Sequence, residues 1–386
     1  MLPAAVLAAL PLLAQENSVQ AGFDHFYNLE YDEALTIFQQ ISAREPSLPD
    51  PHNHIAETLL FREMLRDGAL ESELVSGDNS FLRRPKLNPS PETESRFLEE
   101  INSAIALADS RIKNKPNDTD ALYASGIAYG LRSSYYWLVK KAWRQSLSDA
   151  TAARRQHNRV SELEPANVDA RLVQGLHDYV VGSLPAVWRM FGFLAGIHGD
   201  KERGIQIVQG VASNGIQNRV DAQILLCALY RRENRPMLAV PIIQDLSRRY
   251  PRNYIFSLEL AQMYSMGGDG KSGLAVIDEL IARKANHAPG MDRVPWEKIY
   301  FQQATIQFWY RDLDHALENL KKVASAANEV DLNTGAQVYL RMGQIYDMTQ
   351  RRSEALSAYR KCIAYAPEAD AAHESRKYLA TPYRRT

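Results

Sequence analysis

The segment of this 386-residue chain with the most suggestive chemistry is Ser265–Ser272, which reads SMGGDGKS. It nearly matches the pattern G-x-x-x-x-G-K-S, in which backbone N–H groups and a lysine hold the phosphates of a nucleotide. Ser265 replaces the first glycine, and the preceding residues form a helical pattern ending at Tyr264, whereas a phosphate loop follows a strand. We therefore interpret Gly267 and Gly268 as a helix stop and turn, and we predict no bound cofactor.

A second group of reactive side chains, Asp50, His52 and His54, could ligate a metal ion. No further ligand stands out on a neighbouring element, so we predict a solvated helix start and no metal site. No Ser/His/Asp or Cys/His pairing stands out either, and we predict no catalytic residue and no enzymatic activity. The two cysteines, Cys227 and Cys362, occupy small-residue positions of helical stripes and are expected to be packed thiols.

The composition narrows the class of partner. Lysine and arginine number 45 against 46 aspartates and glutamates, giving a formal net charge of −1. Nucleic-acid-binding proteins usually show a basic excess or patch, so we predict no nucleic-acid partner. A hydrophobic fraction of 45% is sufficient for a continuous core.

Small and apolar residues recur with one fixed spacing at both ends of the chain. Within Ala336–Pro367, intervals of 12, 4, 3 and 5 separate Gly343, Ala355, Tyr359, Cys362 and Pro367. Stripes of this kind predict two helices packed across a short turn, with the glycine and alanine allowing close approach of the backbones. The same intervals near the N-terminus separate Gly22, Ala34, Phe38, Ile41 and Pro46.

This spacing resembles the tetratricopeptide repeat (TPR), a helix–turn–helix unit of about 34 residues. The resemblance implies an all-α fold, a right-handed α-α solenoid of about eight helix pairs ending in a capping helix at about 368–379. We expect one domain over 15–380, with a connector insertion at 67–92 and enlarged units over 119–214. The tail 381–386 is expected to lack fixed structure.

The first residues, 1–14, are apolar and end in Leu-Leu-Ala, which is compatible with a cleaved export signal although a basic start is missing. We therefore expect an exported protein, periplasmic or secreted; the alternative is a frayed N-terminal helix on a cytoplasmic protein.

An apolar segment, residues 184–199, interrupts the fourth pair and contains Trp188. It is too short to cross a bilayer and includes Arg189. We expect it to pack on the third pair through Trp137 and Trp143. The alternatives are an apolar docking ledge and contact with a membrane surface.

This segment carries a second resemblance. It is similar to the Leu-Pro, aromatic-Gly and Gly-Asp-basic-x-x-Gly pattern of the eukaryotic inclusion-body clearance proteins and their TPR relatives of the outer-membrane type. The resemblance implies an all-helical, non-enzymatic protein and assigns no activity to any residue. The matching residues are Leu184, Pro185, Phe191, Gly192, Gly199, Asp200 and Gly204.

In TPR arrays the first helix of each pair lines a concave groove that binds peptides or helices. The groove positions of this chain, just before and after the small residue, are largely aromatic and apolar and include one arginine pair. Aromatic residues and arginine dominate the binding energy of many interfaces. The predicted partner-binding residues are Tyr123, Tyr179, Trp188, Arg231, Arg232, Phe301 and Trp309.

The sequence thus predicts a non-catalytic scaffold that binds a protein or peptide through this groove. One alternative is a ligand-binding or accessory subunit of an envelope complex that uses the enlarged units. Another is membrane-surface association through residues 184–199.

Overall fold

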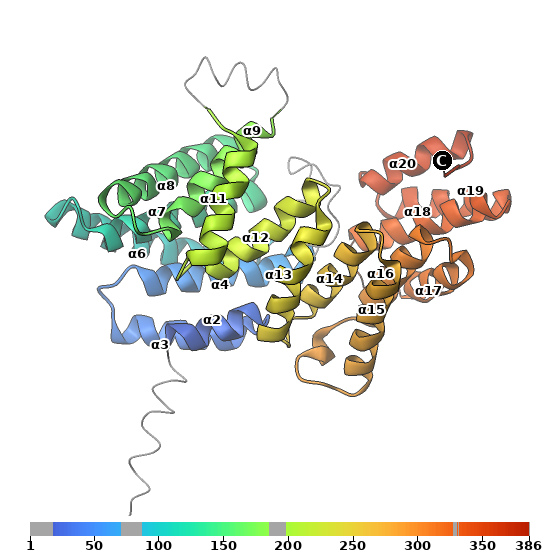
Figure 1. Ribbon diagram of the computed structural model, residues 1–386, viewed down its shortest axis with the longest axis horizontal. Helices are drawn as coiled ribbons and strands as arrows, with labels where there is room; N and C mark the ends of the chain where they lie inside the picture. Colours follow the sequence, from blue (N-terminus) through green and yellow to red (C-terminus); the bar gives the residue numbers. More distant parts are fainter. Residues whose placement is uncertain (1–17, 71–86, 185–197, 327–329, 331, 386) are drawn as a thin grey trace, which may run out of the picture. The chain divides into compact units, whose positions relative to one another are not determined.

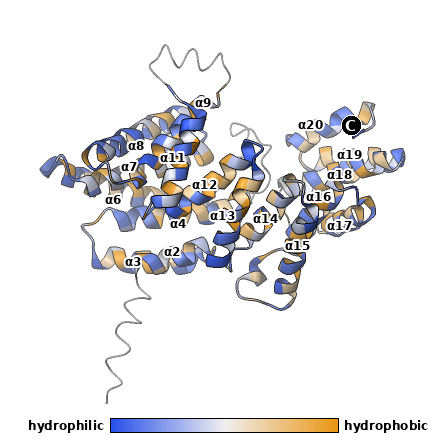
Figure 2. Cartoon of the chain, in the orientation of Figure 1, coloured by the Kyte–Doolittle hydropathy of each residue, from blue (hydrophilic) through white to orange (hydrophobic). Residues whose placement is uncertain are grey.

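The computed structural model describes residues 18–70, 87–184, 198–326, 330 and 332–385, and these ranges contain helices and no strand (Figure 1). Their contacts form two compact units, one of described residues up to Leu229 and the other from Tyr230 onward. Individual helices carry both hydrophilic and hydrophobic residues, as expected for elements that bury one face (Figure 2). The predicted all-α, TPR-like class is confirmed, whereas the extent of a single domain over 15–380 stays a prediction.

In the first unit, consecutive helices pack as pairs. The pairs are α2 (Val19–Tyr27) with α3 (Tyr31–Arg44), α4 (Asp50–Arg66) with α6 (Pro91–Asn114), α7 (Thr119–Tyr135) with α8 (Trp143–Leu163), and α9 (Leu172–Gly182) with α11 (Lys201–Asn214). A π-helical turn, η2 (Tyr136–Lys140), follows α7, and a 3-10 turn, η3 (Asp169–Arg171), precedes α9. The next helix, α12 (Arg219–Arg232), contains the boundary between the units.

The second unit continues the array to the C-terminus. Its helices are α13 (Pro236–Arg249), α14 (Tyr254–Met266), α15 (Gly270–Ala285), α16 (Trp296–Trp309), α17 (Leu313–Ser325), α18 (Leu332–Met348), α19 (Arg352–Tyr365) and α20 (Asp370–Ala380), with the 3-10 turn η4 (Met291–Arg293) before α16. The pairs α14–α15, α16–α17 and α18–α19 pack closely, and α20 packs on both α18 and α19. The predicted capping helix therefore exists, at 370–380.

The fixed spacing has a direct cause in the packing of a glycine against a ring. A Cβ added at Gly343 would lie 2.3 Å from Cε1 of Tyr359, and one added at Gly22 would lie 2.4 Å from Cε1 of Phe38. Both rings follow their glycine by 16 positions and are fully buried. The two helices approach so closely at this point that only a residue without a side chain fits.

The enlarged third pair keeps the same contact despite its insertion. A Cβ at Gly126 would lie 2.6 Å from Nε2 of His157, which follows by 31 positions, the usual 16 plus the 15 extra residues. The enlargement of this pair consists of the π-helical turn Tyr136–Lys140, which ends the first helix, and of a long second helix over Trp143–Leu163. Burial lowers the pKa of His157 to about 4, so the ring is packed in its neutral form.

The segment 265–272 is a helix connection, as the sequence indicated. Helix α14 ends at Met266, Gly268 adopts a φ of 91°, and Asp269 caps α15 by accepting a hydrogen bond from the Ser272 N–H at 3.0 Å. The glycine supplies the left-handed conformation that ends a helix. No strand precedes this loop in the described residues around it, so it has the geometry of a cap and turn.

The histidines near the N-terminus are packed, which corrects the prediction of a solvated helix start. Nδ1 of His52 lies 2.6 Å from a carboxylate oxygen of Glu100. The His54 ring lies 4.8 Å from the Phe23 ring and 5.1 Å from the Phe38 ring, and burial lowers its pKa to about 4. Periodicity alone could not reveal these contacts, because Glu100 is supplied by the delayed second helix of the pair.

Residues 381–385 of the C-terminal tail contact the preceding helices, and for these residues the prediction that the tail lacks fixed structure is wrong. The Tyr383 N–H donates to the Asp347 carboxylate at 2.8 Å, and Arg385 donates to the carbonyl of Phe308 at 3.1 Å. The Tyr383 ring also packs edge-on against Tyr378, with centroids 5.2 Å apart. The tail is ordered because the Asp347 side chain, 1% exposed, requires hydrogen-bond donors.

Several predictions concern residues outside the described ranges. They are the export segment at 1–14, most of the 67–92 connector, and residues 185–197 with Trp188. Among the described helices, none combines the length and apolar character needed to cross a membrane.

Candidate binding site on the first helices

Two predicted partner-binding tyrosines lie inside the first unit. Tyr123 in α7 is 7% exposed and Tyr179 in α9 is 3% exposed. The Tyr123 ring packs edge-on against His157, with centroids 5.0 Å apart. Both rings therefore belong to the packing between helices, and contact of Tyr179 with a partner stays a prediction.

The structure gives the predicted arginine pair two different environments. Arg231 is 4% exposed and donates from Nη1 to both carboxylate oxygens of Glu259, at 3.0 and 2.9 Å. Burial raises the pKa of Glu259 to about 8, and the guanidinium opposes that rise. Arg231 thus joins α12 to α14 as a structural ion pair, whereas Arg232 is exposed.

The two predicted aromatics of α16 have accessible surface. Phe301 is partly exposed and Trp309 is 41% exposed. The guanidinium groups of Arg341 and Arg385 lie over the Trp309 ring, 5.0 and 4.8 Å from its centroid. These cation–π contacts fix the orientation of a large apolar side chain that remains accessible on a first helix.

A polar cluster that the sequence reading missed lies on the first helices of the first unit. The Tyr27 hydroxyl in α2 donates to Asp221 in α12 at 3.0 Å, across 194 positions of sequence. Glu57 in α4 interacts electrostatically with Asp221, and both carboxyl side chains are partly exposed. Three first helices that are distant in sequence thus contribute polar groups to one place.

The Tyr123 hydroxyl forms the buried end of this cluster. It interacts with Asp169, Asp221 and Glu57, and the Asn218 side chain lies near it without hydrogen-bonding geometry. Asp169 has its own partners, since its carboxylate accepts the N–H groups of Ile216 and Asn218 at 2.9 Å. Asp169 therefore secures the start of α12, while Glu57, Asp221 and the Tyr123 hydroxyl lie close enough to interact electrostatically with one another.

Burial is the main influence on the two central carboxyl groups. Burial raises the pKa of Glu57 to about 8, and the neighbouring Asp221 adds to the rise. Burial likewise raises the pKa of Asp221 to about 6, with the Tyr27 hydrogen bond acting in the opposite direction. Two neighbouring buried carboxyl groups destabilise the folded state when both are ionised, unless a cation or a proton neutralises the charge.

A signal for Glu57 was present in the sequence. Glu57 follows Ala56, the small residue of the second pair, in the position that Gln262 and Gln344 hold in later pairs. The second helix of this pair comes only after the 67–92 connector, so the spacing that marks the other pairs is interrupted here. Nothing in the sequence showed that Asp221 lies beside it.

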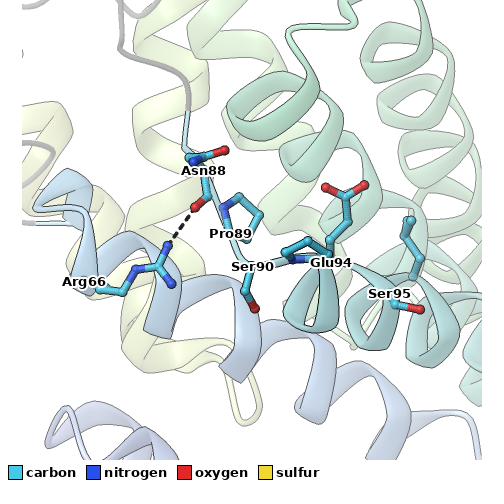
Figure 3. Close-up of a pocket in the computed structure, with 8 residues that line it drawn as sticks. Arg66, Asn88, Pro89, Ser90, Glu94 and Ser95 are labelled. Carbon is cyan, nitrogen blue, oxygen red and sulfur yellow. Dashed lines mark hydrogen bonds between the residues drawn. The ribbon is translucent and has the colours of Figure 1, made fainter.

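An open cavity of about 880 Å³ lies where α4 ends and α6 begins (Figure 3). Arg66 points to the chain before α6 and donates to the Asn88 carbonyl at 2.9 Å, while its other nitrogens contact Glu63 and Asp67. Glu94 on its rim pairs with Lys140. The Arg66 guanidinium and the Glu94 carboxylate on this cavity both have partners within the protein, so they are less available to a ligand than the carboxyl groups at Glu57 and Asp221.

Neither the Glu57 cluster nor the cavity at Arg66 has, among its described residues, an arrangement of side chains suited to a metal ion. In the ranges that the structure describes, no group of three histidine, cysteine, aspartate or glutamate side chains has a suitable arrangement. Cys227 and Cys362 are both buried and lie outside any disulfide in the described ranges, which agrees with the packed thiols expected from their small-residue positions.

The raised pKa values predict how stability depends on pH. Between about pH 4.5 and 8 the folded state binds protons at Glu57 more tightly than the unfolded state does, so the free energy of unfolding falls as pH rises. The low pKa of His54 and His157 acts oppositely below about pH 6.5. We expect urea unfolding to show that the free energy of unfolding falls less between about pH 5 and about pH 8.5 in Glu57→Gln than in wild type. An identical loss in both proteins would contradict the assignment.

No family model matches the chain, and no curated protein matches it. Solved structures with similar folds include the APC/C hetero-tetramer Cut9-Hcn1 (13% identity, covering 92% of this chain and 53% of that chain, TM-score 0.49). Another is a human IFIT1 dimer with m7Gppp-AAAA (13% identity, covering 94% of this chain and 83% of that chain, TM-score 0.45). A third is a tetratricopeptide repeat protein from Parabacteroides merdae (13% identity, covering 80% of this chain and 91% of that chain, TM-score 0.32). This chain spans about half the length of the Cut9-Hcn1 chain that it matches.

Proposed function

We propose that this TPR-type array is a non-catalytic scaffold that binds a protein or peptide segment along its first helices. The observation that carries the proposal is the cluster of Tyr27, Glu57 and Asp221, which come from three first helices and include two partly exposed carboxyl groups that interact with each other. In the second unit, Phe301 and Trp309 add accessible aromatic surface on α16, another first helix. These are the positions at which helical repeats present residues to a ligand.

A peptide or protein suits this surface better than a nucleic acid. The first-helix cluster is acidic, and the whole chain has a net charge of −1, so phosphates would be repelled. A polypeptide supplies both charged and apolar side chains, which suit the carboxyl groups of the first unit and, separately, the accessible aromatic rings of the second unit.

The test is selection of a random dodecapeptide library on the full chain, followed by hydrogen exchange with the selected peptides. We expect slower exchange in the first helices α4, α7 and α12, or α14 and α16, and unchanged exchange in the second helices α3, α6 and α8. For peptides that protect α16, Trp309→Ala should weaken binding about thirtyfold, the effect of losing an aromatic anchor of about 2 kcal/mol. Trp143→Ala, which removes an exposed tryptophan from the second helix α8, is the matched control. Protection confined to second helices, or no selected peptide, would overturn the proposal.

Export of the protein is a separate part of the proposal. It rests on the apolar run at residues 1–14 alone. Mass determination of the mature N-terminus in the native host tests it, and an intact Met1 on the whole population would count against it. Association with membranes through 184–199 remains an alternative; liposome flotation with all protein left in the soluble fraction would remove it.

A further inference from the structure

We propose that Glu57, Asp221 and the Tyr123 hydroxyl form a subsite for a cationic side chain, a lysine or arginine of the bound polypeptide. This inference rests on the proposed function and assigns the chemistry of one position along the first helices. The three groups come from α4, α12 and α7, all within the first unit.

The first step in the argument is that, in the part of the chain that the structure describes, no lysine or arginine pairs with the two carboxyl groups. The groups that influence Glu57 and Asp221 among the described residues are other carboxyls, the Tyr27 hydroxyl and the backbone, with no lysine or arginine among them. Two poorly exposed carboxylates elsewhere in the described chain have a basic partner, Glu259 with Arg231 and Asp347 with Arg352, whereas Asp169 accepts backbone N–H groups instead. The position at Glu57 therefore has the acidic half of an ion pair without the basic half.

The second step concerns buried acceptors that are independent of the carboxyl groups. Tyr123 is only 7% exposed, and its hydroxyl makes no hydrogen bond. The hydroxyl does interact electrostatically with the carboxyl groups of Glu57 and Asp221. Asn53, one helical turn before Glu57, is 2% exposed; its amide donates to the Ala124 carbonyl at 2.8 Å, but its Oδ1 accepts no hydrogen bond. A buried polar atom left without a partner costs about 1–3 kcal/mol, which a ligand donor would recover.

The third step is access and shape. Glu57 and Asp221 are each partly exposed, while Tyr123 is buried, so a ligand would meet the carboxyls first and the hydroxyl last. Ammonium and guanidinium groups carry several N–H donors and a positive charge, and therefore match two carboxylates and a hydroxyl oxygen. An anionic or purely apolar ligand group would leave both the charge and the acceptors unsatisfied.

The experiment uses the full chain and a fluorescein-labelled heptapeptide, Gly-Ser-Arg-Ala-Arg-Ser-Gly, with a lysine version and a version in which citrulline replaces arginine. Fluorescence anisotropy at low salt gives the dissociation constants. We expect the citrulline peptide to bind at least tenfold more weakly than the arginine peptide. The double variant Glu57→Gln/Asp221→Asn, which keeps side-chain size and an acceptor for Tyr27, should lose this preference.

The matched control is Glu99→Gln/Glu162→Gln, which removes two exposed carboxylates from the second helices α6 and α8 of the same unit. It should retain the preference, and circular dichroism should show that both double variants are folded. A second readout is proton release: the cation should displace protons from the wild-type cluster at neutral pH, measured by calorimetry in two buffers, but not from the Glu57→Gln/Asp221→Asn variant.

Equal binding of the arginine and citrulline peptides, no binding of either, or equal losses in both double variants would overturn the subsite. The proposed function fails separately. If library-selected peptides still protect the first helices while showing no preference for basic residues, the scaffold role stands and only the cationic subsite is lost.

Discussion

Replacement of Arg231 by methionine is expected to lower the free energy of unfolding of the second unit by about 3–5 kcal/mol, the usual cost of breaking a buried ion pair. The reason is the environment of Glu259, which is 1% exposed and receives two hydrogen bonds from the Arg231 guanidinium at 3.0 and 2.9 Å. Without the arginine, the carboxylate must be buried unpaired or take up a proton. Urea denaturation, with hydrogen exchange of α14 amides to report on this unit, measures the loss.

The double variant Arg231→Met/Glu259→Leu separates the effect of charge from that of packing. A buried ion pair is often no more stabilising than apolar residues of similar volume, so the double variant should recover to within about 1 kcal/mol of wild type. If it stays as unstable as Arg231→Met, the loss comes from packing and the ion-pair explanation is wrong.

Replacement of Gly343 by leucine should destabilise the last pair by about 3 kcal/mol, the upper part of the range for overpacking. The Tyr359 ring lies where the new Cβ would be, 2.3 Å from Cε1, and it cannot move aside easily. Its ring is fully buried, and its hydroxyl donates to Asp347 at 2.9 Å. Thermal unfolding of the variant tests this, and an unaltered melting curve would contradict the assigned contact.

Gly210 in α11 provides the control for a helical glycine without a contact. A Cβ there meets nothing within 4 Å, so Gly210→Ala should stabilise its helix by about 1 kcal/mol because alanine has the better helix propensity. If the substitution at Gly343 destabilises the protein and the substitution at Gly210 stabilises it, the close helix contact, and not helix propensity, explains the glycine at position 343.

The helical architecture was accessible from the sequence because its cause is local. A glycine or alanine 16 positions before a large ring, with apolar residues in phase, defines the contact between two consecutive helices, and Gly22 with Phe38 shows the same geometry as Gly343 with Tyr359. The turn at Gly267–Gly268 was recognised for the same reason, since a helix stop depends on neighbouring residues. In contrast, the ordered tail depends on Asp347, more than 30 positions away, and was missed.

In the candidate site, too, features set by neighbouring residues were predictable from the sequence, whereas contacts between distant helices were not. The sequence by itself determined that the chain forms paired helices and ends in a further helix near 368–379. It also predicted positions that would face a ligand, and two of these, Phe301 and Trp309, are accessible on α16. Only the tertiary structure decided that Arg231 is used up by Glu259, and that Glu57 and Asp221 share one place. Periodicity specifies the face of a helix on which a residue lies, because that follows from 3.6 residues per turn. It does not specify which charge from a distant helix lies opposite, and that pairing decides whether a charged residue stabilises the fold or remains available to a ligand.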